Sequence, residues 1–351
     1  MVERKGSIQA MTTLRAGVIG YGFGGRIFHS PLLEAAGFEV SAIQTSNPDR
    51  VAAAKKDFPA AKIVASIEEL IALKLDLIVV SSQNVGHKSQ AIAALRAHIP
   101  TVVDKPFAIN YADTKEILDI ANKEKTPITV FFNRRFDSDT LTIKKAMSEG
   151  SLGKVFRLEG RFERWAPVTA PDAWREALTK EQGGGKLLDL QPHLLSAVTE
   201  LFGPAELKFS AVRSIRAFSD DDSVLMVQHA SGVDSYLSAC EAMGAPGPRI
   251  RVTGDKGTLI IQDLDPQEGF IKDGVRPVNG KWEVDTRSKA YLHRGPEVVE
   301  YESVPGNYVD FYLQVKACIE GKGEMPVSQS DILMIAKIID DAYEHSIHKT
   351  K

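Results

Sequence analysis

The stretch Leu14–Gly25, LRAGVIGYGFGG, decides the fold of the first half of the chain. An apolar run, Ala16–Ile19, is typical of a short buried strand, and Gly20-x-Gly22-x-x-Gly25 follows it directly. In such a strand–turn–helix the first glycine permits a tight turn, the second admits a pyrophosphate, and the third lets helix and strand pack closely. Because backbone N–H groups at a helix start attract phosphate, the pattern predicts a dinucleotide site, with a plain tight turn as the alternative.

Working outward, short apolar runs alternate with helical stretches as far as about Asn133. Strands are expected at Leu14–Gly20, Glu39–Gln44, Lys62–Ala65, Leu75–Ser81, Thr101–Asp104 and Ile128–Phe132. Helices are expected at Arg26–Ala36, Asp49–Phe58, Ile67–Leu73, Gly86–Ala97 and Tyr111–Lys123. This alternation predicts a Rossmann domain, a doubly wound parallel sheet that binds ligands outside the carboxyl ends of its strands.

The second half has a different texture. Consecutive strands are expected at Val155–Glu163, Leu207–Ile215, Val224–His229, Ser235–Glu241, Arg249–Thr253 and Thr258–Ile261. Helices are expected at Thr140–Ser148, at Leu187–Phe202, and at about Tyr308–Ile319 and Ser328–His345. The α/β chain is therefore predicted to join a Rossmann domain (12–134) to an α+β domain (135–327) with a large, mainly antiparallel sheet, and a final helix (328–347) is expected near the junction.

Composition excludes several classes of function. With 43 basic and 46 acidic residues, the formal charge of −3 leaves no footprint for nucleic acid or for a membrane surface. The two cysteines, Cys240 and Cys318, have no metal-ligand spacing, and so few indicate a reducing compartment. No apolar run reaches the roughly 18 residues of a membrane span, and MVERKGSIQA lacks the apolar core of a secretory signal. We expect a soluble cytoplasmic protein with a small-molecule partner.

The loops after the predicted Rossmann strands supply the candidate cofactor-binding residues. The second of these loops, Thr45–Arg50, decides the cofactor, because an acidic residue there prefers NAD whereas a basic one accepts a 2′-phosphate. No carboxylate stands at Thr45-Ser46, and Arg50 follows, so NADP is predicted over NAD; the alternative is that Thr45–Asp49 only caps a helix. The cofactor-binding set is Gly20, Gly22, Phe23, Gly25, Arg26, Thr45, Ser46, Arg50, Ser81, Ser82, Asn84, His87, Asp104 and Lys105.

The predicted helix Leu187–Phe202 carries an acid–base pair. Its apolar stripe is expected to be its buried face, made of Leu187, Leu190, Leu194, Val198, Leu201 and Phe202. Asp189 and His193 lie four residues apart on the other face, where a carboxylate prepares an imidazole as a general base. The alternatives are an acid that counters the helix dipole beside a surface histidine, or a two-ligand metal site that lacks a third His or Cys cluster.

Lys105 ends the fifth predicted strand within Asp104-Lys105-Pro106. A lysine at this edge of the sheet can hydrogen-bond a substrate hydroxyl, and Pro106 would fix the backbone there, as a cis bond. Alone, the lysine is equally typical of a solvated charge.

Together these motifs resemble the glucose-fructose oxidoreductase/inositol dehydrogenase/MocA-like family, and within it the scyllo-inositol dehydrogenase-like branch. The resemblance runs from Leu14 to about Ile347 and is carried by Gly20–Leu32, Asp104–Pro106, Asn133–Asp137 and Gly184–Gly203. It implies an NAD(P)-dependent oxidoreductase acting on a secondary alcohol of a sugar or cyclitol, expected as a homo-oligomer (dimer or tetramer) through an open sheet face.

The resemblance also assigns roles. His193 would take the hydroxyl proton, Asp189 would orient His193, and Lys105 would hold the reacting oxygen; no metal is expected. From their positions in the chain, and not from the resemblance, Arg134, Trp174, Arg175 and Tyr308 are expected to bind substrate, with a core anchor as the alternative for Trp174.

The chain departs from the family pattern at three places. Asp104 replaces the usual Glu, Ser82-Gln83 replaces a frequent Thr-Pro, and Gln191-Pro192 precedes His193. Because proline fits only the first turn of a helix, Pro192 predicts a helix that starts later than Leu187. Two other functions therefore stay open: a non-catalytic dinucleotide-binding regulator, and a reductase of a non-sugar carbonyl or imine.

Overall fold

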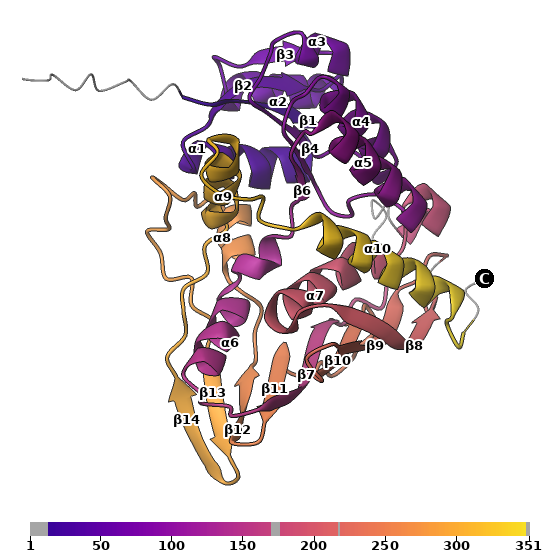
Figure 1. Ribbon diagram of the computed structural model, residues 1–351, viewed down its shortest axis with the longest axis vertical. Helices are drawn as coiled ribbons and strands as arrows, with labels where there is room; N and C mark the ends of the chain where they lie inside the picture. The colour runs from indigo at the N-terminus through magenta and orange to yellow at the C-terminus, as the bar shows by residue number, and fades with distance from the viewer. Residues whose placement is uncertain (1–12, 170–175, 217, 349–351) are drawn as a thin grey trace, which may run out of the picture.

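The computed structural model describes residues 13–169, 176–216 and 218–348, which form two sheets with their helices (Figure 1). The first sheet contains six parallel strands in the order β3-β2-β1-β4-β5-β6. This order confirms the predicted Rossmann fold. The strands are β1 (Arg15–Ile19), β2 (Glu39–Gln44), β3 (Lys62–Val64), β4 (Leu77–Val80), β5 (Thr101–Val103) and β6 (Ile128–Val130).

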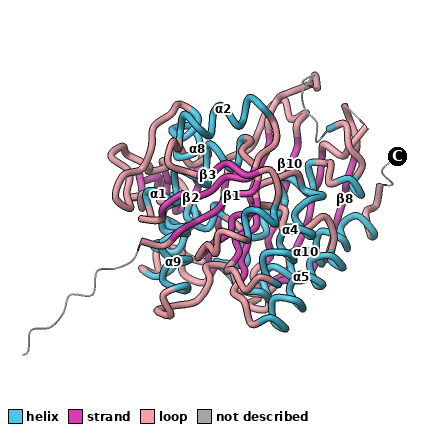
Figure 2. The backbone as a smooth tube through the Cα atoms, turned by 90° about the horizontal axis from the view of Figure 1, so that it is seen from above, coloured by secondary structure: helices cyan, strands magenta, loops and turns pink. Residues whose placement is uncertain are grey.

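Helices cover both faces of this sheet. Seen from above, α4 and α5 lie side by side on one face, and α1 lies beside α9 on the other (Figure 2). The helices of this half are α1 (Ser30–Ala35), α2 (Pro48–Asp57), α3 (Ile67–Ile71), α4 (His87–Arg96) and α5 (Tyr111–Glu124). The central strand β4, LIVV, is wholly apolar and every one of its residues is buried, because both faces of the sheet are covered.

The helix after the glycine turn differs from the predicted Arg26–Ala36. The chain first forms a π-helical turn, η1 (Gly24–His29), and only then α1. The Ser30 N–H reaches back to the Gly25 carbonyl, which also accepts from the Ser30 hydroxyl at 2.7 Å. The π-helical turn is wider than an α-helical one and directs the His29 side chain inward, where it is fully buried.

The second sheet has eight strands in the order β14-β13-β12-β11-β7-β10-β9-β8. All its pairs are antiparallel except β7 with β10, so the predicted mainly antiparallel sheet is confirmed. Three elements were not predicted, α8 (Gln267–Lys272), β13 (Ala290–Arg294) and β14 (Glu297–Tyr301). The other strands are β7 (Val155–Glu163), β8 (Ala205–Arg213), β9 (Asp222–His229), β10 (Asp234–Cys240), β11 (Ile250–Gly254) and β12 (Gly257–Ile261).

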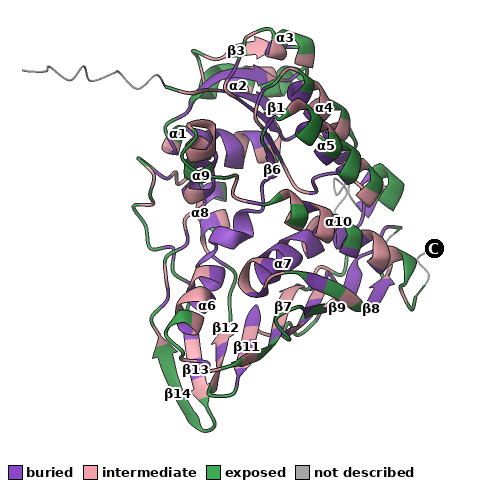
Figure 3. Ribbon diagram, viewed as in Figure 1, coloured by how far each residue is buried: buried purple, intermediate pink, exposed green. Residues whose placement is uncertain are grey.

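Helix α7 (Lys186–Phe202) packs on β7, β9 and β10 and is covered by α10 (Gln329–Glu344) (Figures 1 and 3). The prediction of one buried stripe is wrong: His193 and Ser196 on the other face are buried, whereas Leu190 and Leu201 of the stripe are only half-buried. The predicted late start is also wrong, because Pro192 lies inside the helix. Contacts on both faces offset the roughly 3 kcal/mol that an interior proline costs.

Helix α6 (Ser138–Ser148) is followed by Gly150 at φ +69°, as predicted.

The last two helices contact both halves of the molecule. α9 (Val309–Ile319) packs on α1 of the Rossmann half, and α10 contacts α5 as well as α7 and β8 (Figure 1). Within the described ranges, no helix is both long and apolar enough to span a membrane.

Candidate active site

Lys105 joins the two halves of the molecule. It follows β5 and precedes Pro106 in a cis peptide bond, as predicted. Its ammonium group donates to the Asp189 carboxylate at 2.6 Å and to the Asp189 main-chain carbonyl at 2.9 Å. The lysine is therefore an ordered, largely buried cation that points at α7 rather than a solvated charge.

His193 lies one turn further along α7. The ring is 7% exposed, and its Nδ1 atom has no hydrogen-bond partner within the described ranges. Burial, with the positive charges of Lys105 and Arg134, holds the pKa of His193 well below its ordinary value. The imidazole is therefore neutral at pH 7 and able to accept a proton.

Asp189 was expected to pair with His193, but it contacts Lys105. The predicted i,i+4 pair places Asp189 near His193, and its charge acts on the ring. Its Oδ1 atom, however, accepts from Lys105, and the Nδ1 atom that an orienting carboxylate would hold is without a hydrogen bond. Asp189 thus orients the lysine in this structure, since the cation attracts the carboxylate more strongly than a neutral imidazole does.

Asp104 lies in a cluster at the carboxyl ends of β4 and β5. Its Oδ2 atom accepts from Ser81 at 3.0 Å, and its Oδ1 atom accepts from the Lys105 N–H at 2.8 Å. The Nε2 atom of His29 lies 3.3 Å from Asp104 Oδ2, outside hydrogen-bond alignment. Burial raises the pKa of Asp104, but the nearby histidines and Lys105 outweigh it and keep the carboxylate ionised.

Sequence reasoning missed His29 as a member of this cluster. Its Nδ1 atom pairs with the Tyr312 hydroxyl at 2.6 Å, which links α9 to the glycine turn. The only signal in the sequence is the position of a histidine directly after that turn, and the π-helical geometry that buries it could not be foreseen.

The glycine turn has the shape of a phosphate cradle. Gly20 has φ +88°, and a Cβ atom there would lie 2.5 Å from the Ser81 carbonyl oxygen. Gly25 packs directly on the Gly20 carbonyl, so the third glycine is also required by close contact. At Gly22, by contrast, the nearest atoms to an added Cβ belong to the Arg50 guanidinium, at 3.6 Å. The backbone at Gly22 and the cation of Arg50 therefore face the same space, which suits a phosphorylated dinucleotide.

The other predicted cofactor residues divide into two groups. Phe23, Ser46 and Arg50 are exposed around the cradle, and Ser82 is half-buried. Thr45, Asn84 and His87 are buried, and His87 contacts the carbonyl groups of Pro106 and Ser82 through its two ring nitrogens. Asn84 donates to the Gly183 carbonyl, and Arg26 pairs with Asp57 at 2.7 Å. In this structure Asn84, His87 and Arg26 therefore contact neighbouring segments of the chain and hold the loops in place.

Two predicted substrate residues lie in a buried charge network. Arg134 donates to the Tyr308 hydroxyl at 2.9 Å and pairs with Asp137 and Glu268. Tyr308 is fully buried and donates to Asp137 at 2.7 Å. Burial raises the pKa values of both Asp137 and Tyr308. Arg134 and Tyr308 are therefore held by this network in the present structure. The other two predicted substrate residues, Trp174 and Arg175, lie outside the described residues.

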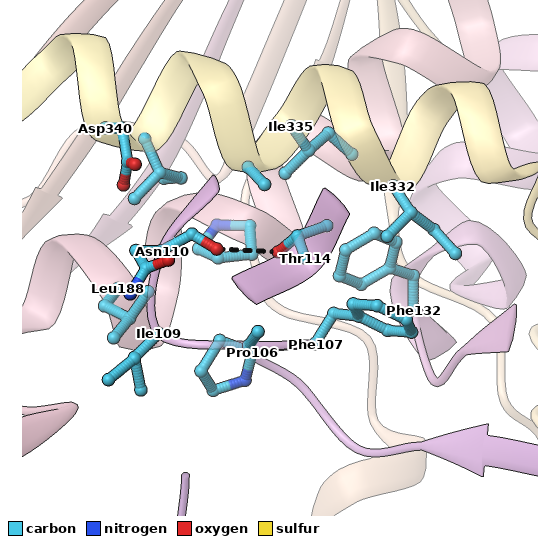
Figure 4. Close-up of a pocket in the computed structure, with 14 residues that line it drawn as sticks. Pro106, Phe107, Ile109, Asn110, Thr114, Phe132, Leu188, Ile332, Ile335 and Asp340 are labelled. Atoms are coloured by element: carbon cyan, nitrogen blue, oxygen red, sulfur yellow. Dashed lines mark hydrogen bonds between the residues drawn. The ribbon is translucent and has the colours of Figure 1, made fainter. Parts of the chain in front are cut away.

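A narrow apolar cavity lies against the backbone of the site. Pro106, Leu188 and Pro192 line it together with residues of α5 and α10 (Figure 4). These residues directly neighbour Lys105, Asp189 and His193 in the sequence. Side chains of α10, including Ile332 and Ile335, face Pro106 and Phe107 across the cavity (Figure 4). The packing of α10 therefore supports both elements that carry the catalytic candidates.

Comparison with protein families assigns both halves of the chain. Residues 14–132 match the oxidoreductase family, NAD-binding Rossmann fold, and residues 144–351 match the oxidoreductase family, C-terminal alpha/beta domain.

Relatives are similar over nearly the whole length. The uncharacterized oxidoreductase YdgJ of Escherichia coli K12 is 33% identical over 96% of this chain and 97% of its own. The scyllo-inositol 2-dehydrogenase (NADP(+)) IolW of Bacillus subtilis is 28% identical over 96% of this chain and 95% of its own. The solved structure of yvaA from Bacillus subtilis superposes with a TM-score of 0.85 at 28% identity, covering 95% of this chain and 96% of that one. Since both domains match in order, the chain belongs to the Gfo/Idh/MocA oxidoreductase family.

Proposed function

We propose that this protein is an NADP-dependent dehydrogenase that oxidises a secondary alcohol of a sugar or cyclitol. The contact between Lys105 and Asp189 carries the proposal, because it brings the end of a cofactor-binding sheet onto the helix that holds a neutral histidine. The likeness to IolW, named as an NADP-dependent scyllo-inositol dehydrogenase, supports the same substrate class.

Each side chain then has a defined task. The nicotinamide ring supplies the acceptor for the hydride. Lys105 donates a hydrogen bond to the reacting oxygen and stabilises negative charge that develops on it. His193 accepts the hydroxyl proton, because its low pKa leaves it unprotonated. Asp189 holds Lys105 in position through two contacts.

The proposed preference for NADP rests on the end of β2. Thr45 and Ser46 present no carboxylate that would repel a 2′-phosphate. Arg50, on the first turn of α2, is exposed and lies beside Gly22. Asn47 caps α2 by accepting from the Arg50 N–H at 3.1 Å, so the helix start that bears the cation is itself ordered.

The first experiment is a titration of the purified protein with NADPH and NADH by nicotinamide fluorescence, followed by a panel of polyols and sugars with the oxidised cofactors. We expect tighter binding of NADPH and reduction of NADP on a polyol. Lys105→Met should abolish turnover while it leaves NADPH binding intact, and Lys115→Met, an exposed lysine paired with Asp119 on α5, serves as the control. Normal turnover in Lys105→Met would overturn the role of the lysine.

Binding without turnover across the whole panel would favour the cofactor-binding regulator. The Gln191-Pro192 pair gives that alternative little support, because α7 continues through it and His193 stays within the electrostatic influence of Lys105. Turnover on a carbonyl or imine alone would instead support the reductase.

A further inference from the structure

Lys186 occupies a position that is unfavourable for a cation. It is the first residue of α7, where the helix dipole is positive, and it is 7% exposed. A buried ammonium group without compensating partners is costly as well. The side chain must therefore be held by contacts strong enough to offset both effects.

Three carboxylates surround this cation. The Lys186 Nζ atom lies 3.1 Å from Glu241, 3.4 Å from Glu176 and 3.8 Å from the Oδ2 atom of Asp189. The other oxygen of Asp189 accepts from Lys105. The two oxygens of the Asp189 carboxylate thus face two different lysines.

The carboxylates that hold Lys186 are themselves held. Glu241, which follows β10, pairs with Arg164, and Glu176 pairs with Arg216 at 3.3 Å. Arg216 in turn pairs with Asp221 at 3.1 Å. Since Glu241 and Arg216 are at most 5% exposed on their side chains, this network has few ways to rearrange, and the position of the Lys186 ammonium is well defined.

We propose that Lys186 is a positioning residue, which shares the charge of Asp189 and keeps this carboxylate turned toward Lys105. The inference rests on the proposed function for its catalytic consequence. With Lys186 in place, Asp189 cannot swing away from Lys105 without leaving a buried cation less compensated. Through Asp189, Lys186 thereby helps to position Lys105, the residue proposed to hydrogen-bond the reacting oxygen. Lys186 itself contacts neither substrate nor cofactor in this proposal.

The charge of Lys186 reaches His193 through Asp189, which lies 3.8 Å from Lys186 and acts on the imidazole. The charged groups that act on His193 come from the end of β5 (Lys105 and Asp104), from η3 (Arg134) and from α7 itself (Asp189). The positive charge of Lys186 partly offsets the negative charge of Asp189, which lies on the same helix. Removal of its charge leaves Asp189 more effective, so the pKa of His193 should rise.

The test compares Lys186→Met with Lys186→Arg and with Lys180→Met, an exposed lysine six residues earlier that serves as the control. We expect kcat for polyol oxidation to fall on the order of ten- to a hundredfold in Lys186→Met, since misplaced catalytic groups cost this much. The dissociation constant for NADPH should stay unchanged, and Lys186→Arg should recover most of kcat. An unchanged kcat in Lys186→Met would overturn the proposal.

A second variant distinguishes the positioning role of Lys186 from an effect on folding stability. A second measurement distinguishes it from a failure of the proposed function. Lys186→Met/Glu241→Gln removes both charges of a pair, and Arg164 can then be solvated because its side chain is 61% exposed. NMR titration of the His193 imidazole in the NADP-bound protein needs no turnover. A pKa that rises in both variants supports the proposal even if no polyol is oxidised, and a pKa equal to that of the wild type in both variants overturns it.

Discussion

At the scale of single residues, the proposed role of His193 as a base makes activity depend on its protonation. The pKa of His193 lies well below 6.5 because of burial and of the charges of Lys105 and Arg134. The acid limb of kcat/KM for alcohol oxidation should therefore lie below pH 6.5, where a solvated histidine would already be protonated. Steady-state rates from pH 4.5 to 9 measure it, and a limb at or above pH 6.5 would contradict the assignment of His193 as the base.

The same shift has a consequence for stability. Since the folded state depresses the pKa, the unfolded chain binds more protons as the pH falls below about 6.5. The contribution of His193 to stability is present above that pH and is lost as the pH falls through the folded pKa.

Arg50 gives the second prediction at this scale. Arg50→Ala should weaken NADPH binding roughly ten- to a hundredfold, which corresponds to the loss of about 1.5–3 kcal/mol from hydrogen bonds to a charged group. NADH binding should change little, because NADH lacks the 2′-phosphate. Fluorescence titration measures both constants, with Arg96→Ala on the exposed end of α4 as the control. Equal losses for the two cofactors would show that Arg50 serves the common pyrophosphate instead.

At the scale of elements, the start of α7 depends on an acid from a distant loop. Gly185 at the N-cap offers no side chain, and Asp220, just before β9, takes over this role. The Asp220 carboxylate accepts from the Leu187 N–H at 2.6 Å and from the Tyr343 hydroxyl at 2.8 Å, so it also joins α10 to α7. The start of α7 is therefore anchored by a residue from outside the helix.

This anchor should make stability depend on pH. Burial raises the pKa of Asp220 to about 6, from an ordinary value of 3.8. A raised folded pKa means that the contribution of the acid is full below pH 3.8 and is lost as the pH rises through 6. The difference in unfolding free energy between the wild type and Asp220→Asn should thus decrease from pH 4 to pH 7, by up to about 3 kcal/mol.

Urea unfolding at several pH values measures this difference. Asp265, whose pKa burial also raises to about 6, is present in both proteins, so its titration cancels in the comparison. A difference that is independent of pH would show that Asp220 stays ionised in the folded state.

At the scale of the whole molecule, the two faces of the second-half sheet differ in what they carry. Helix α7 packs on β7 and β10 at the face that carries Leu158 and Leu237, which are both buried. A cross-strand row on the opposite face runs through Phe209, Met226, Tyr236, Glu159, Arg251, Ile260 and Tyr291. Phe209 and Tyr236 expose 41% and 38% of their surface within this row. Exposed aromatic groups on a broad sheet are typical of interfaces.

We expect a second copy of the chain to cover this row. The wild type should elute as a dimer or tetramer in size-exclusion chromatography with light scattering, and Tyr236→Glu at the centre of the row should shift it to a smaller species. Lys123→Glu on the exposed face of α5 is the control. A monomeric wild type would contradict the expected oligomer.

Much of this protein follows from local sequence patterns. The Gly20–Gly25 turn and the strand–helix alternation predicted a parallel sheet whose order is that of a Rossmann fold, because glycine spacing and apolar periodicity act over a few residues. The strand boundaries differ from the predicted ones by one or two residues at most ends. The sequence also predicted the positions of Lys105 after a strand and of Asp189 and His193 on one helix, since these depend on local spacing, but it did not predict that Asp189 contacts Lys105.

Contacts between distant segments were decided only by the tertiary structure. Asp189 pairs with Lys105, which lies 84 residues away in the sequence. His29 lies 3.3 Å from Asp104 because a π-helical turn directs it inward, and the residue spacing did not predict that turn. The late strands β13 and β14 and the burial of both faces of α7 depend on what packs against them. Periodicity shows which residues of a segment share a face, but only the assembled fold determines which faces are covered and which charges meet.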